Sequence, residues 1–186
     1  MYVRVKHPVK RWYDWWYPIT FSALIGSAIA HWPLQFNLVG ERGLVETFNG
    51  LLGVLIGFFI AALAAVATFD RPGMDEVMRG ESPTLTVPYR KEPLALTRRM
   101  YLCLLFGYLT LVTLIAFFAF SLANVLFSRA DSSLVGPEAY GFGRTAFIYL
   151  YCFVLAHILC HSLLGVHYLS WRAVIADKII VEPERR

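Results

Sequence analysis

The chain has 186 residues, of which 58% are hydrophobic and only 16% are charged, and its mean hydropathy is +0.55. This composition excludes an ordinary soluble domain and indicates an integral membrane protein. The net charge of +4 is small, and its distribution along the chain indicates a membrane topology rather than direct nucleic-acid binding.

Four apolar runs are long enough to cross a bilayer, at 19–36, 50–69, 101–127 and 145–171. About 20 helical residues, each rising ~1.5 Å, cover the ~30 Å hydrocarbon core. The runs predict an all-α fold: a polytopic membrane protein in which residues 1–186 form one domain of four transmembrane helices. They leave no room for a separate soluble domain, so extramembrane chemistry must come from loops or from a partner.

The N-terminal segment combines four cations with a cluster of aromatic rings. Such rings favour the headgroup layer, where the ring is half buried and its polar edge stays wet; they are Trp12, Tyr13, Trp15, Trp16 and Tyr17. We interpret the cluster as an interfacial anchor, in which Asp14 and Pro18 interrupt any amphipathic surface helix. Inside the first span Pro33 predicts a kink or an early helix end, and residues 34–47 are expected to lie along the membrane surface.

Small residues recur every four positions in the second span. They form one ridge along a helix face, which consists of Gly53, Gly57, Ala61 and Ala65. A second helix can approach such a ridge closely and gain van der Waals contact, which is how helices associate in lipid. Two interpretations stay open: the ridge packs within the chain's own bundle, or it joins copies of the chain into a homo-oligomer.

The connection at 70–99 is the largest extramembrane piece. Its prolines keep long helices out, and the alternation of threonine with apolar residues at 84–87 predicts one short strand. Its five acids and six bases form no nucleotide or nuclease motif. We therefore predict a docking surface for a cytoplasmic protein, and its cations are Arg90, Lys91, Arg98 and Arg99.

Lysine and arginine are unequally divided between the two sides of the four predicted spans. One side holds fourteen of them, in the N-terminal segment, the connection at 70–99 and the C-terminal tail, and the other side holds three. Because cations stay on the cytoplasmic side, this bias places both termini in the cytoplasm. On the opposite side, the glycine-rich stretch at 128–143 is expected to be a turn between the last two spans.

The fourth span carries the most chemistry. At 100° per residue, four of its side chains fall within an arc of about 120°: His157, Cys160, His161 and His167. Ionisable groups inside a span face protein or water. In one interpretation neutral histidines bond to neighbouring helices and order the bundle. In a second they bind haem or a metal, with His31 at similar depth on the first helix, and in a third they line a proton or ion path through an oligomer.

Catalytic signatures are missing from the sequence. It contains no nucleophile elbow, phosphate loop, pair of intramembrane acids or zinc-protease string, and we therefore expect neither enzymatic activity nor a bound cofactor or metal.

The stretch GFFIAALAAVATFDRPGMDE, at 57–76, is a small-residue helix that exits into Asp-Arg-Pro-Gly. It resembles the second helix and exit turn of small four-span proteins from bacterial antiphage defence loci, in particular the membrane subunit of the Kiwa system. The resemblance implies a non-catalytic subunit of the bacterial inner membrane that works with a cytoplasmic, DNA-binding effector. It thus favours a sensor and scaffold that oligomerises and recruits the effector; a pore-forming effector and a haem-binding redox subunit remain the alternatives.

Overall fold

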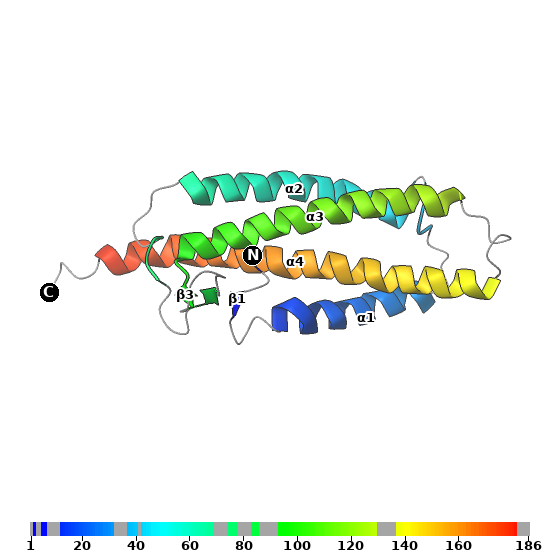
Figure 1. Ribbon diagram of the computed structural model, residues 1–186, viewed down its shortest axis with the longest axis horizontal. Coiled ribbons are helices and arrows are strands. Elements are labelled where there is room, and N and C mark those ends of the chain that lie inside the picture. Colours follow the sequence, from blue (N-terminus) through cyan, green and yellow to red (C-terminus); the bar gives the residue numbers. More distant parts are fainter. Residues whose placement is uncertain are drawn as a thin grey trace.

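The computed structural model describes Tyr2 and residues 5–6, 12–31, 37–40, 42–68, 74–77, 83–85, 93–129 and 137–181 (Figure 1). This part of the chain is mostly helical, which confirms the all-α prediction. A π-helical turn, η2 (Trp12–Trp16), leads into α1 (Tyr17–His31). The longer helices are α2 (Leu44–Thr68), α3 (Arg98–Arg129) and α4 (Pro137–Val181).

Three of these helices are long and apolar enough to cross a membrane, over Leu44–Thr68, Arg98–Ser128 and Tyr140–Ser170. Helix α1, which corresponds to the first predicted span, has 15 residues and is not among them. It ends at His31, shortly before Pro33, because the residue that precedes a proline disfavours the helical conformation. The remainder of the predicted span, at 32–36, lies outside the described residues.

The surface segment expected at 34–47 is wrong at its C-terminal end, where α2 already begins. The helix begins at Leu44, so the end of that segment is already helical. A tight turn precedes it, with φ of +94° at Gly40 and +63° at Arg42. In this turn the Leu44 amide donates to the Asn37 carbonyl over 2.9 Å, and the carboxylate of Glu46 accepts the Arg42 amide. These bonds satisfy amides at the helix start and fix the bend there.

Helix α4 corrects the expected turn at 128–143, since it begins at Pro137. Proline suits the first turn of a helix, where its missing amide costs no hydrogen bond. The helix continues to Val181, whereas the predicted span ended at residue 171. The first part of the predicted tail is therefore helical.

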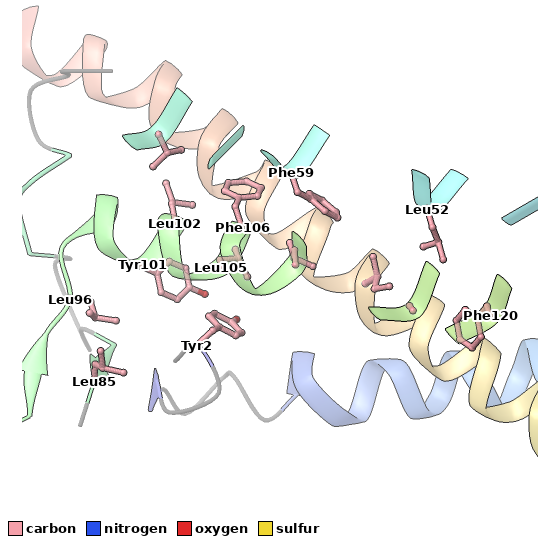
Figure 2. Packing of buried hydrophobic residues seen from close by; sticks show 14 of the residues in the cluster. Tyr2, Leu52, Phe59, Leu85, Leu96, Tyr101, Leu102, Leu105, Phe106 and Phe120 are labelled. Carbon is pink, nitrogen blue, oxygen red and sulfur yellow. The ribbon is translucent and has the colours of Figure 1, made fainter. Parts of the chain in front are cut away.

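The helices lie side by side in the order α2, α3, α4, α1 (Figure 1). Helix α2 packs on α3 through buried residues that repeat every seven positions, namely Val45, Leu52, Phe59 and Val66. Helix α3 carries two buried series with the same spacing: Leu102, Leu109 and Ala116, and Phe106, Thr113 and Phe120. Figure 2 shows Leu102, Phe106 and Phe120 among them. A seven-residue repeat keeps the seam of two helices in contact only if they cross at the shallow angle of a left-handed pair.

Helix α1 packs on α4 through a ridge of its own. Its buried residues are Pro18, Ser22 and Gly26, spaced by four. The Ser22 hydroxyl donates to the Tyr149 carbonyl over 2.7 Å, and a Cβ at Gly26 would lie 2.8 Å from the Tyr149 ring. The small residues thus let α1 approach α4 closely.

Three short strands form an antiparallel sheet in the order β1 (Val5–Lys6), β2 (Thr84–Leu85), β3 (Leu94–Ala95). Lys6 pairs with Thr84, and Leu85 pairs with Leu94. A strand is thus present within the predicted 84–87 stretch, but its pairing with the N-terminal segment was not foreseen. The sheet lies toward the bundle end where α2 stops, α3 begins and α4 stops (Figure 1); we call this the strand end.

Candidate functional site

Five polar side chains from three distant parts of the chain meet beside α3 and α4. Tyr2 and Asp14 come from the N-terminal segment, Tyr108 comes from α3, and His157 and His161 come from α4. We call this group the histidine cluster. Two of its members have the i, i+4 spacing that places side chains on the same helix face.

His161 is the centre of the cluster and has no exposed surface. Its Nδ1 lies 2.9 Å from the His157 carbonyl oxygen, which can only accept, so Nδ1 carries a proton and donates it. Its Nε2 lies 2.9 Å from Oδ1 of Asp14. A hydrogen bond there needs a second proton, held either by the imidazole or by the carboxyl group. Asp14 and His161 therefore share one proton, and with it on the ring they form an ion pair.

The ring of His157 is fixed by two neighbours. Its Nδ1 lies 3.3 Å from the backbone carbonyl of Asp14, which requires Nδ1 to donate. Its Nε2 lies 2.8 Å from the Tyr108 hydroxyl and, in the neutral ring, accepts the phenolic proton. The imidazole centroids of His157 and His161 are 4.2 Å apart. The two rings thus form adjacent links between α3, α4 and Asp14.

Tyr2 closes the cluster from the N-terminal side and is only 3% exposed. Its ring stacks on Tyr108 at a centroid distance of 4.9 Å and meets the His161 ring edge-on at 5.8 Å. It also lies beside Tyr101 (Figure 2). Burial raises the pKa of the Tyr2 hydroxyl far above its usual range, so this phenol stays protonated.

Of the four residues predicted on the histidine face, the structure brings His157 and His161 together. Cys160 is half buried, and His167 is exposed nearer the strand end. His31 does not join them. It follows Asp14 by seventeen positions, which is about 25 Å along a helix. Among the described residues no group of three or more histidine, cysteine, aspartate or glutamate side chains is placed to hold a metal ion.

The ridge on α2 faces away from the contacts between helices. Gly53, Gly57 and Ala61 are exposed and Ala65 is half buried. A Cβ at Gly57 would meet no atom within 4 Å, and one at Gly53 would meet only the Phe117 ring, at 3.9 Å. Within the described chain, α2 therefore packs through its seven-residue repeat rather than through the ridge.

The structure describes two of the four predicted docking cations. Arg90 and Lys91 lie outside the described residues, and Arg98 is half buried. Arg99 is engaged within the chain, where its guanidinium contacts both carboxylate oxygens of Asp75 at 2.8 and 3.0 Å. It also donates to the Val66 and Ala67 carbonyls at the end of α2, over 3.3 and 3.4 Å. Hydrogen bonds from Arg99 lower the pKa of Asp75 below its usual value.

Sequence reasoning found the histidines but missed Tyr2, Asp14 and Tyr108. A signal was present for one of them, because Asp14 is the only acid within the aromatic stretch 12–17. An acid among rings that are expected to enter a membrane surface needs a partner, and histidine at intramembrane depth is a suitable one. Tyr2 and Tyr108 carried no comparable signal.

The arrangement can hold and share protons and can tie chain segments together. Comparison with models of protein families, with curated proteins and with solved structures gave no match.

Proposed function

We propose that this chain is a non-catalytic scaffold of the bacterial inner membrane that oligomerises and holds a cytoplasmic effector at its strand end. The observation that carries the proposal is the division of the molecule into apolar helices and one structured polar end. The candidate spans are buried over only 17% to 39% of their most apolar stretches. The surface that stays exposed on these helices is apolar, as contact with lipid requires. The three strands and the Asp75–Arg99 ion pair lie at the strand end instead.

The path of the chain supports four spans rather than three. Asp14 contacts His161 on the strand-end half of α4. The chain then runs along α4, and the Gly40 amide donates to the Asn124 side chain, over 2.8 Å, near the other end of α3. Asp14 and Gly40 thus contact the bundle at different depths, Asp14 beside the middle of α4 and Gly40 near the end away from the strands. We therefore propose that η2 and α1 together form the first span, with both termini in the cytoplasm.

Order at the strand end favours a docking role. The sheet joins the N-terminal segment to the connection at 70–99, and Arg99 joins that connection to the end of α2. Helix α4 extends past the candidate span to Val181. A surface that is already ordered loses less conformational entropy when a protein binds. The resemblance of 57–76 to the Kiwa membrane subunit supplies the class of partner, an effector of antiphage defence.

Co-purification tests this function. The tagged chain is co-expressed with the products of its neighbouring genes, and the proteins that remain bound in detergent are quantified. Charge reversal at Arg90 and Lys91 should reduce the captured partner by about tenfold or more, since unfavourable charge contacts weaken docking. Arg144→Glu is the matched control, because it reverses an exposed cation at the other end of α4 and should leave capture unchanged.

Two results would contradict the proposal. If no neighbouring product binds, the scaffold function is wrong. If the doubly reversed variant and a variant truncated after residue 171 both capture the wild-type amount, docking does not involve the connection or the tail. Insertion itself should survive the reversal, because the remaining cations still lie overwhelmingly on one side.

A further inference from the structure

The N-terminal segment is held against α3 and α4 by contacts that all converge on the histidine cluster. Its Asp14 contributes both a carboxylate and a backbone carbonyl, and Tyr2 contributes a buried ring. We propose that Asp14 and His161 form a proton-dependent latch. While they share a proton, the latch holds the N-terminal segment, and with it the edge strand β1, on the bundle.

The mechanical connection follows from the order of elements along the chain. Strand β1 lies between Tyr2 and Asp14, so the segment that contains it is attached to the bundle on both sides. β1 pairs with β2, and β2 pairs with β3. β3 is followed within three residues by Arg98, the start of α3. Release of Asp14 would therefore free one edge of the sheet without breaking a helix.

The sign of the proton dependence follows from the facing atoms. With the shared proton present, Nε2 and Oδ1 are hydrogen-bonded at 2.9 Å. Loss of that proton ends the ion pair and leaves one ring proton for two acceptors, the Asp14 carboxylate and the His157 carbonyl, each 2.9 Å from a ring nitrogen. Whichever nitrogen lacks the proton then faces an acceptor with its lone pair, and two acceptors at this distance repel each other. Gain of a further proton can occur on Oδ2, and Oδ1 then still accepts from the imidazolium. Alkalinisation should therefore open the latch, and mild acidification should not.

Among the described residues, the other titratable groups around the pair do not reverse this sign. Three of them are phenols, which are uncharged near neutral pH: Tyr2 from the N-terminal segment, and Tyr101 and Tyr108 from α3. His157, from α4, donates through Nδ1 in either protonation state, and the Tyr108 hydroxyl can donate to its Nε2 or accept from it. Asp14 and His161 are thus the pair whose ion pair depends on the shared proton.

Hydrogen exchange of the full chain in lipid nanodiscs tests the latch without any partner, so its outcome is independent of the proposed function. Protection factors, which remove the intrinsic pH dependence of exchange, are measured from about pH 6 to about pH 9. In the wild type the peptides that contain β1, β2 and β3 should lose protection by at least about tenfold as the pH rises. Peptides at the start of α2 and the end of α3 should stay unchanged and report that the bundle remains folded.

Variants separate a latch from a merely structural contact. The double variant Asp14→Asn, His161→Gln keeps an amide hydrogen bond but cannot titrate, so its strand protection should not vary with pH. His167→Gln, which replaces an exposed histidine on the same helix, should behave as the wild type. The proposal is overturned if wild-type strand protection is independent of pH, if the double variant retains the pH dependence, or if protection is lost throughout the bundle together with the strands.

Discussion

Oδ1 of Asp14 and Nε2 of His161 lie 2.9 Å apart, although 147 positions separate the two residues in the chain. The contact joins the segment before α1 to the last helix, and His161 is fully buried beneath it. A charged or proton-sharing group at such a site is costly unless its partner stays in place. The register of the N-terminal segment on α4 is therefore strongly specified by this pair.

The first prediction concerns the stability that the pair provides. His161→Ala should lower the free energy of unfolding by about 2–3 kcal/mol, because it removes the hydrogen bond to Asp14 and leaves a cavity beside Tyr2. The apparent melting temperature in detergent should fall by roughly 5 °C or more. His167→Ala, at an exposed position on α4, should change it by less than about 1 °C. Equal melting temperatures for the two variants would show that the pair does not stabilise the fold.

The second prediction concerns the ridge of α1. Gly26→Ala should destabilise the protein by about 1–3 kcal/mol, because the added Cβ would lie 2.8 Å from Cδ1 of Tyr149. Gly50→Ala is the matched control, since a Cβ there meets no atom within 4 Å and alanine favours the helix. Thermal unfolding of both variants checks this. A normal melting temperature for Gly26→Ala would mean that α1 does not pack on α4 as closely as described.

The third prediction concerns Asp75 and Arg99. Since hydrogen bonds from Arg99 lower the folded-state pKa of Asp75 below 3.8, the stabilisation is fully present above that value and is lost as the pH falls through the lower folded-state pKa. Exchange protection around 74–77 should therefore be constant near neutral pH and decrease only in strong acid. Asp75→Asn should remove this decrease. A decrease that persists in the variant would assign it to another group.

The fourth prediction concerns the exposed ridge of α2. Gly57→Leu should leave the fold of one chain intact, because no atom lies within 4 Å of a Cβ at that position. It should nevertheless shift the assembly toward monomer in native mass spectrometry, because a branched side chain blocks close helix approach. Ala119→Leu, at an exposed small residue on α3, is the control. Wild-type assembly in Gly57→Leu would exclude the ridge as the oligomer contact.

Hydropathy was sufficient to predict the helical class and three of the apolar helices, because lipid requires long uncharged runs. The face shared by His157 and His161 was also predictable, since helical periodicity fixes which side chains neighbour one another. Their partners were not, because Tyr2, Asp14 and Tyr108 reach the site through tertiary packing between segments far apart in sequence.

Small-residue spacing was informative but ambiguous. The same four-residue period occurs at Ser22 and Gly26 on α1 and at Gly53 and Gly57 on α2, yet only the α1 pair is buried within the chain. Spacing shows that close approach is possible, and it does not identify the approaching helix. The alternation at 84–87 predicted a strand, but its pairing with β1 and β3 was not predictable, because strands of two residues derive their stability from pairing rather than from their own sequence.

The location of the two chain ends tests the account most directly, because docking at the strand end requires both ends in the cytoplasm. Green fluorescent protein and alkaline phosphatase are fused in turn at the N-terminus, at the C-terminus and within 130–136. Fluorescent protein should be active at both termini and phosphatase only at 130–136, since four spans return the chain to its starting side. Phosphatase activity at the N-terminus, with fluorescence at the C-terminus, would mean three spans and would contradict the account.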